Sequence, residues 1–189
     1  MDYNTFVMLG KPGAGKGKQS ALLAEATGYS VFSTGGRFRE IRDSGTFMGQ
    51  KIDKVLKTGD LMPSWFAVYL FQEAVLNREP NEGVIYEGAG RMRPEAEIFH
   101  EVMTWLERPY RAVHINLPDD VALNRLLKRA SVEGRKDDKE EVIRHRLDIY
   151  RQEVIPSVEF FREKGTLIEV NGDQTPEAVH AELIATLKG

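Results

Sequence analysis

The sequence contains no cysteine among its 189 residues, which excludes disulfides, cysteine-ligated zinc and a cysteine nucleophile. It has no apolar run near the ~20 residues that span a bilayer, and it begins without the charged-then-apolar pattern of a secretion signal. We therefore expect a cytoplasmic protein with no membrane partner. No excess of positive charge is present either, because 26 Lys and Arg stand against 29 Asp and Glu. A net charge of -3 argues against a protein that coats nucleic acid, so we expect no nucleic-acid partner.

What is present is the composition of an ordinary globular domain, with 41% hydrophobic and 29% charged residues. Strand-like and helix-like segments alternate along the chain, and several of the strands are continuously apolar, which favours a parallel sheet covered on both faces. We expect one domain over residues 1–189. Strands are expected at residues 3–9, 31–32, 83–87, 111–117 and 166–170. Helices are expected at residues 16–27, 46–57, 64–78, 94–106, 118–129, 139–164 and 176–187, with a further one opening at Ser33-Thr34, a polar loop at 131–138 and a bend near Pro156.

The glycine-rich residues 10–17 follow the first predicted strand and open a helix. This is the context of a phosphate loop, in which backbone N–H groups and the helix N-terminus face an anion. Lys16 is placed to reach the terminal phosphates of a nucleotide. An incidental glycine-rich turn is the alternative, and the strand–loop–helix context disfavours it. The general motif has Ser or Thr after the lysine to bind magnesium, whereas this chain has Gly17.

Several motifs, this loop included, can be compared with known enzymes. They are G-K-P-G-A-G-K-G at residues 10–17, S-T-G-G-R-F-R at 33–39, G-D-L-M-P at 59–63, E-G-A-G-R at 87–91, N-R-L-L-K-R at 124–129, G-R-K-D-D at 134–138 and I-R-H-R-L at 143–147. Together they make the chain resemble the adenylate kinase family of nucleoside monophosphate kinases over almost its whole length. The resemblance implies a three-layer α/β/α P-loop kinase fold with a five-stranded parallel sheet. It also implies a helical acceptor-binding insertion at about residues 34–63 and a short lid at 130–138 without zinc.

The resemblance further implies the residues of the site. Those expected to bind the donor ATP are Gly13, Ala14, Gly15, Lys16, Gly17, Lys18, Arg125, Arg129 and Asp173. Those expected to bind the acceptor are Thr34, Arg39, Met62, Gly88, Arg91, Glu95, Arg135 and Arg146. The catalytic set would be Lys16, Arg91, Arg129, Arg135 and Arg146, because positioned cations stabilise the charge that develops during phosphoryl transfer. Glu87 would hold Mg²⁺ through water.

The chain departs from the family pattern at five positions in or near these motifs. Lys18 replaces a threonine that meets the donor α-phosphate, Gly36 and Glu87 replace aspartates, Gly90 replaces a proline, and Glu95 replaces the glutamine that reads the acceptor base. The last change bears on the substrate. A carboxylate only accepts hydrogen bonds, so it loses one of the two bonds that a glutamine makes to adenine and suits the two donors on guanine.

The resemblance as a whole implies reversible, Mg²⁺-dependent phosphoryl transfer from ATP to a nucleoside monophosphate by a monomer. AMP is the favoured acceptor, giving two ADP. Two alternatives stay open at this point. One is a related kinase whose acceptor is GMP or a pyrimidine monophosphate, suggested by Gly36 and Glu95, and the other is a nucleotide-binding protein with weakened catalysis, suggested by the number of departures.

Overall fold

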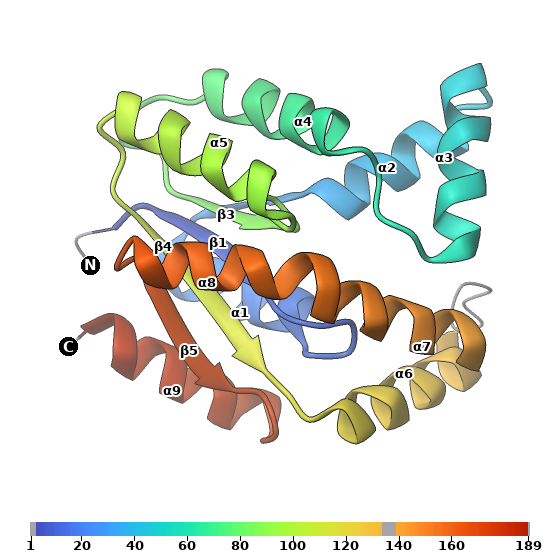
Figure 1. Cartoon of the computed structure of the whole chain (residues 1–189). Helices are drawn as coiled ribbons and strands as arrows, with labels where there is room; N and C mark the ends of the chain where they lie inside the picture. Colours follow the sequence, from blue (N-terminus) through green and yellow to red (C-terminus); the bar gives the residue numbers. More distant parts are fainter. Residues whose placement is uncertain (1–2, 134–138, 189) are drawn as a thin grey trace.

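The computed structural model describes residues 3–133 and 139–188. Within them, five parallel strands form one sheet in the order β2-β3-β1-β4-β5, with β1 at the centre (Figure 1). The strands are β1 Thr5–Leu9, β2 Ser30–Ser33, β3 Val84–Glu87, β4 Tyr110–Asn116 and β5 Leu167–Asn171. The predicted α/β class and five-stranded parallel sheet are confirmed, with small differences at the strand ends.

The central strand shows why the sheet is covered on both faces. All of β1 is buried, and its side chains alternate between two apolar clusters, with Phe6 and Met8 in one and Val7 and Leu9 in the other. The first cluster is completed by side chains from α1 (Lys16–Thr27), α6 (Asp119–Glu133) and α9 (Pro176–Lys188). The second is completed by α4 (Ser64–Leu76), α5 (Arg93–Trp105) and α8 (Ile155–Glu163). Two helical layers therefore enclose the sheet.

A third, smaller core lies beside the sheet and joins α2 (Thr34–Asp43), α3 (Phe47–Thr58) and α4. Its buried side chains include Phe38, Ile52 and Met62. The helix α2 begins as expected, because the Ser33 hydroxyl accepts a hydrogen bond from the Gly36 N–H at 3.1 Å. Residues 34–63 thus form a helical unit at one end of the molecule (Figure 1), and their acceptor-binding role stays a prediction.

The end of α6 differs from the prediction. The helix continues to Glu133, so the expected end at Arg129 and the loop expected from Ser131 are wrong for residues 131–133. No glycine or proline interrupts the chain before Gly134, and without such a stop signal the helix gains further backbone hydrogen bonds. The rest of the expected lid, residues 134–138, lies outside the described residues.

The long helix expected at residues 139–164 is divided in two. α7 (Glu140–Ile149) is followed by a π-helical turn, η1 (Tyr150–Val154), and then by α8. The Ile155 N–H donates to the Tyr150 carbonyl, which is the wide hydrogen bond of a π-helix. Pro156 comes next and has no N–H to give, so the interruption predicted from the proline falls on the turn before it.

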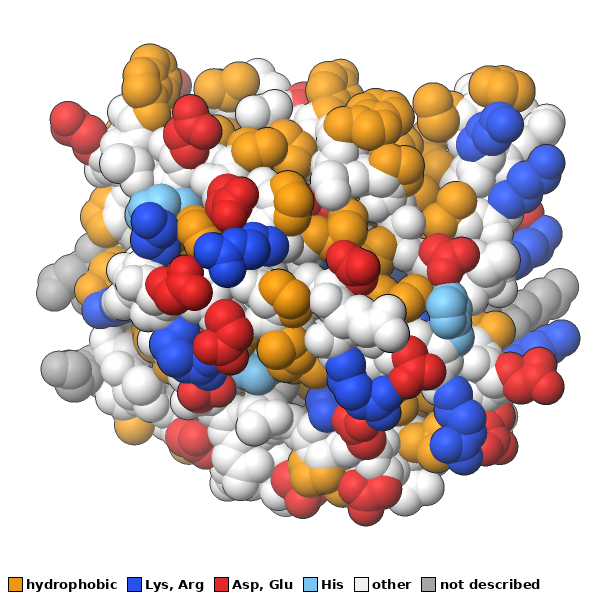
Figure 2. All heavy atoms as spheres, viewed as in Figure 1, with side chains coloured by type: hydrophobic (Ala, Val, Ile, Leu, Met, Phe, Trp, Pro, Cys, Tyr) orange, Lys and Arg blue, Asp and Glu red, His pale blue; other side chains and the backbone are white. Residues whose placement is uncertain are grey.

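The surface carries charges of both signs. Figure 2 shows acidic and basic side chains interspersed over the face in view, with hydrophobic side chains gathered along the upper edge where α4 lies. On α4 (Ser64–Leu76), the side chains of Trp65, Tyr69 and Leu76 are exposed. In the part of the chain that the structure describes, no helix is long and apolar enough to cross a membrane.

Candidate active site

A pocket opens where the carboxyl ends of β1 and β3 meet the phosphate loop, α2 and α7. This is where parallel sheets of this class hold ligands. Every described residue of the expected acceptor set lines it, namely Thr34, Arg39, Met62, Gly88, Arg91, Glu95 and Arg146, and Lys16 joins them. Arg135 lies outside the described residues. The structure therefore brings together residues that are up to 130 positions apart in the sequence, from Lys16 to Arg146.

Lys16 occupies the first turn of α1, behind Gly15, whose φ of 91° lies in the left-handed region that glycine favours. The ammonium donates hydrogen bonds to the carbonyls of Gly10 at 2.6 Å and Lys11 at 3.0 Å. Burial, together with the positive charge of Arg91, lowers the pKa of Lys16 to about 7. Arg146 and Arg129 act in the same direction, while Glu87 opposes them. The described cations of the catalytic set, Arg91, Arg129 and Arg146, thus all act on the charge of Lys16.

Arg91 reaches the pocket by folding back over the chain. Gly88 has a φ of 89°, and a Cβ at that position would lie 3.0 Å from Nη2 of Arg91. The missing side chain of Gly88 therefore makes room for the guanidinium. Burial lowers the pKa of Arg91, and the carboxylates of Glu95 and Glu87 oppose this shift.

Glu95 lies in the first turn of α5 and is only 4% exposed. Its carboxylate accepts hydrogen bonds from the backbone N–H groups of Arg91 at 2.8 Å and Met92 at 3.4 Å, which satisfies two free donors at the start of the helix. Burial raises the pKa of Glu95 to about 7, although these two bonds and the charge of Arg91 lower it. A solvent-facing helix carboxylate, the ordinary alternative for this position, is thus wrong.

Thr34 contributes a hydroxyl whose hydrogen-bonding capacity is unused. Its Oγ1 is buried and has no hydrogen-bond partner among the described residues, although the residue lines the pocket. A buried hydroxyl without a partner costs free energy, so a ligand that bonds to it is favoured.

Glu87 ends β3 beside the start of α1. A Cβ on Gly17 would lie 3.6 Å and 3.7 Å from its two carboxylate oxygens, so Glu87 faces the place where the general motif has Ser or Thr. A lone carboxylate beside phosphate oxygens is the kind of ligand set that Mg²⁺ accepts. Elsewhere, the described residues contain no group of three or more His, Asp or Glu that could hold a metal ion.

Lys16 is the one member of the expected donor set that lines the described pocket. Gly13 packs against α6, because a Cβ there would lie 2.9 Å from the Ala122 carbonyl. Arg125 donates to the Gln174 carbonyl at 3.3 Å, which brings this arginine to the turn that contains Asp173. Of the remaining donor residues, Ala14 is buried under the loop, and Lys18 and Gly17 are exposed at the start of α1. None of these residues is among those that line the described pocket.

Gly90 shows how one departure from the family motif is accommodated. Its φ is 62°, a value that a proline ring does not allow, so the backbone here follows a path closed to the family's proline. The Ser157 hydroxyl donates to the Gly90 carbonyl and fixes this path against α8.

Some pocket residues were missed by the sequence reasoning, including Phe38, Leu56, Asp60, Ile149, Tyr150 and Val154. For two of them, Asp60 and Tyr150, a pattern in the sequence could have predicted a place in the pocket. Asp60 belongs to the quoted G-D-L-M-P motif, and its carboxylate lies 2.6 Å from Nε2 of His145 on α7. Tyr150 stands four residues after Arg146, which is the spacing of one helical face.

The chain is similar in sequence to known proteins over most of its length. The family model described as adenylate kinase matches residues 8–166. An adenylate kinase of Thermus thermophilus is 35% identical over 96% of this chain and 95% of its own length. Adenylate kinase 1 of Nostoc is 37% identical over 96% and 97%, and an adenylate kinase of Leptospira biflexa is 30% identical over 96% and 98%. The chain belongs to the adenylate kinase family and is a nucleoside monophosphate kinase that uses ATP.

Proposed function

We propose that the protein transfers the γ-phosphoryl group of ATP reversibly to AMP, forming two ADP, and that it needs Mg²⁺ and acts as a cytoplasmic monomer. The observation that carries the proposal is the convergence of Lys16, Arg91 and Arg146 on one pocket in which Thr34 offers an unpaired buried hydroxyl. Phosphoryl transfer requires little covalent chemistry from the protein, so alignment and charge neutralisation supply most of the rate.

The catalytic step rests on the cations. Lys16, Arg91, Arg129, Arg135 and Arg146 neutralise the charge that spreads over the transferring oxygens. Lys16 leaves the carbonyls of Gly10 and Lys11 and turns to the phosphates, because an anionic ligand is a stronger partner for an ammonium than two neutral carbonyls are. The anion also restores the charged form of a lysine whose pKa lies near 7.

The acceptor is held at both ends. Arg39 and Arg91 would bind its phosphate through their guanidinium groups. Thr34, Met62, Gly88 and Glu95, which line the same pocket, would face its base and sugar. Because burial raises the pKa of Glu95 to about 7, its protonated form is available near neutral pH. A protonated carboxyl both donates and accepts, so it can replace glutamine opposite the N1 and N6 groups of adenine. This is why AMP stays the favoured acceptor despite the substitution.

The donor lies along the phosphate loop. The N–H groups of residues 13–17 and the N-terminus of α1 bind its phosphates, and Lys18 adds a charge at the α-phosphate. Arg125 and Asp173 flank the nucleoside, and Arg129 faces the transferring phosphoryl group. Glu87 would hold Mg²⁺ through water, next to Gly17. The ion would neutralise part of the charge on the phosphates.

A second acceptor, GMP, is favoured by one observation: Glu95 remains a carboxyl group in the pocket wall. In its ionised form it accepts from both donors on the guanine edge. The choice between AMP and GMP as acceptor therefore depends on the protonation state of Glu95.

The test is to incubate the protein with ATP, Mg²⁺ and each of AMP, GMP, CMP and UMP, and to separate the products by chromatography. AMP is expected to be consumed fastest with two ADP formed per ATP used, and GMP to come second. A Lys16→Met variant serves as the inactive control. Lack of turnover with all four monophosphates would contradict the proposal, and preference for GMP would select the second candidate.

A further inference from the structure

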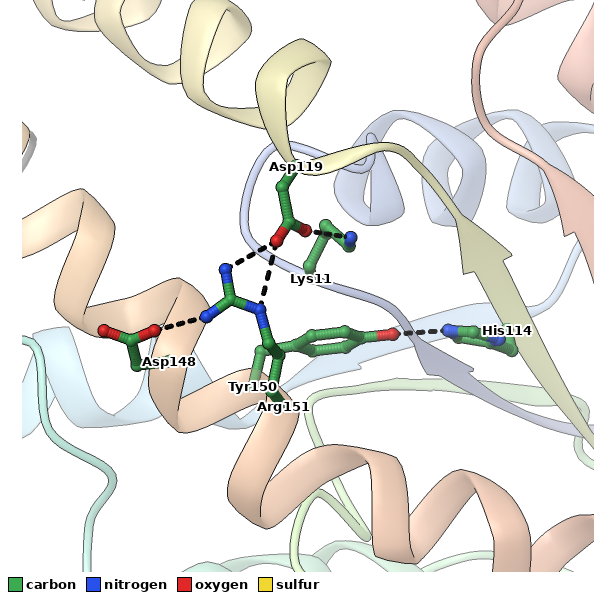
Figure 3. Close-up of polar contacts among 6 residues, drawn as sticks. All are labelled: Lys11, His114, Asp119, Asp148, Tyr150 and Arg151. Atoms are coloured by element: carbon green, nitrogen blue, oxygen red, sulfur yellow. Dashed lines mark hydrogen bonds and ion pairs between the residues drawn. The ribbon is translucent and has the colours of Figure 1, made fainter.

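The π-helical turn η1 is anchored by two consecutive residues that point to different parts of the fold (Figure 3). The hydroxyl of Tyr150 lies 2.6 Å from Nε2 of His114 on β4. Arg151 reaches across to Asp119 at the start of α6, with Nη2 2.6 Å and Nε 3.1 Å from the carboxylate. π-Helical turns occur frequently at functional sites, and Tyr150 and Val154 of this turn line the pocket.

The Tyr150 arm ties the pocket wall to the sheet. Nδ1 of His114 lies 3.3 Å from the Glu169 carboxylate, which can only accept, so Nδ1 carries the proton. Burial lowers the pKa of His114 and keeps the ring neutral, so Nε2 accepts from the Tyr150 hydroxyl. The hydroxyl of Tyr150, a residue that lines the pocket, is therefore held by the sheet residue His114.

The Arg151 arm ends on the phosphate loop. Asp119 divides its carboxylate between two cations, with one oxygen on Arg151 and the other on the ammonium of Lys11. The Lys11 side chain is 10% exposed, against 53% for Arg151. The same ammonium lies 5.4 Å from the centre of the Tyr150 ring, so Lys11 also packs on the other anchor residue.

Lys11 consequently stands between two proposed catalytic cations. Its backbone carbonyl accepts from the Lys16 ammonium at 3.0 Å. Its side chain holds η1, which directly follows the helix that carries Arg146. The Lys11 ammonium is already neutralised by Asp119 and covered by Tyr150, so it is not a group that faces nucleotide phosphates.

We propose that Lys11, Asp119 and Arg151 form a clamp in which Lys11 is a positioning residue for phosphoryl transfer. The clamp sets the distance between the phosphate loop with Lys16 and the helix with Arg146. Lys11 acts through these two cations and touches neither nucleotide. This inference rests on the proposed function, because it assumes that Lys16 and Arg146 work together on a transferring phosphoryl group.

The test compares variants by the kcat and KM of the reaction that the wild-type chain catalyses. Lys11→Met keeps most of the side-chain volume and removes the charge. We expect kcat to fall about tenfold, since small misplacements of reacting groups cost this much or more, while the KM for ATP changes less than about twofold. Lys11→Arg restores the pair with Asp119 and is expected to recover most of kcat. Arg144→Met removes an exposed ion pair with Glu140 on α7 and serves as the matched control with unchanged kcat.

A double-mutant cycle tests the clamp itself. Lys11→Met and Arg151→Met both act through Asp119, so we expect the double variant to lose clearly less kcat than the product of the two single losses. If Lys11→Met fails to fold, Arg151→Met alone still tests the clamp, because Arg151 is half-exposed and its substitution leaves the buried Lys11 in place. We expect it to lower kcat about threefold, since its side chain is more exposed than that of Lys11.

Three results would overturn the inference. The first is a Lys11→Met variant that loses thermal stability with kcat unchanged, which would make the clamp purely structural. The second is a raised KM for ATP with kcat unchanged, which would make Lys11 a donor ligand. The third is independence of the two losses in the cycle. Absence of turnover in the wild-type chain itself would contradict the proposed function as well, so the two failures are told apart in the same experiment.

Discussion

The carboxylate of Glu95 accepts a hydrogen bond from the backbone N–H of Arg91 at 2.8 Å. The residue expected to read the acceptor base therefore also fixes the backbone of the residue expected to hold the acceptor phosphate. The contacts of the Glu95 carboxylate and its burial favour different protonation states. Bonding to backbone N–H groups and the charge of Arg91 favour the ionised carboxylate, whereas burial favours the neutral acid and prevails, so the pKa of Glu95 rises to about 7.

Glu95 should make the stability of the protein depend on pH. Its pKa is about 7 in the folded chain and near the ordinary 4.5 in the unfolded chain, so its favourable contribution is complete below pH 4.5 and is lost as the pH rises through 7. Relative to wild type, Glu95→Gln should gain on the order of 2 kcal/mol of unfolding free energy between pH 5 and pH 8. Urea unfolding at both pH values measures this. Glu97→Gln, on the exposed side of the same helix, is the control, and an equal effect of Glu95→Gln at both pH values would refute the assignment.

The same group should set the ratio of acceptors. Below pH 7 the protonated carboxyl matches adenine, and above pH 7 the carboxylate matches guanine. The ratio of kcat/KM for AMP to that for GMP is expected to fall roughly fivefold from pH 6 to pH 8, the value of about one hydrogen bond. In Glu95→Gln the ratio should stay constant and favour AMP. A wild-type ratio that does not vary with pH would remove Glu95 from base recognition.

Thr34→Val tests the unpaired hydroxyl. The substitution keeps the shape of the side chain and removes an Oγ1 that has no partner among the described residues. The free energy of unfolding should therefore stay the same or rise slightly. The KM of the acceptor should rise roughly fivefold, with the KM of ATP unchanged. Steady-state kinetics with each substrate varied in turn separates the two. A rise in the KM of ATP instead would place Thr34 on the donor side.

Nucleotide binding should be accompanied by proton uptake at Lys16. Its pKa of about 7 leaves most of the ammonium deprotonated at pH 8, and the phosphates of a bound nucleotide favour the charged form. Titration calorimetry at pH 8 in buffers of different ionisation enthalpy should report uptake approaching about one proton per ATP. Lys16→Arg, which is always charged, should show little uptake. Equal binding enthalpies for the wild-type chain in all buffers would mean that Lys16 is already charged.

Removal of the Glu87 carboxylate charge should weaken the use of Mg²⁺. Glu87→Gln retains the size of the side chain that faces Gly17 and loses the charge. The Mg²⁺ concentration for half-maximal activity is expected to rise roughly tenfold, with activity recovered at high Mg²⁺. Titration of activity with Mg²⁺ at fixed ATP measures this. An unchanged Mg²⁺ requirement would show that the carboxylate serves β3 and Arg91 only.

The parts of the site that were predictable follow from local signals and from the geometry of parallel sheets. Gly10 to Lys16 form a phosphate loop between a strand and a helix, a context visible in the sequence. The carboxyl ends of parallel strands lie at one edge of the sheet, so the residues that follow β2 and β3 must lie near this loop. Thr34, Gly88 and Arg91 accordingly lie in the pocket with Lys16.

The parts that were not predictable depend on packing between distant segments. Lys11 and Asp119 are separated by 108 positions, and no local pattern joins them. The pKa of Glu95 depends on burial under neighbouring helices, whereas the sequence only shows a carboxylate early in a helix. The π-helical turn at Tyr150 likewise depends on which side chains anchor it, because Pro156 alone predicts an interruption without its form.

The most direct measurement of the central claim follows the γ-phosphoryl group itself. The protein is incubated with AMP, Mg²⁺ and ATP labelled at the γ-phosphate, and the label is located after a short reaction. The account predicts label in the β-phosphate of ADP, formed at least about a hundredfold more slowly by Lys16→Met. Label that stays in ATP, or that is released as inorganic phosphate without labelled ADP, would contradict it.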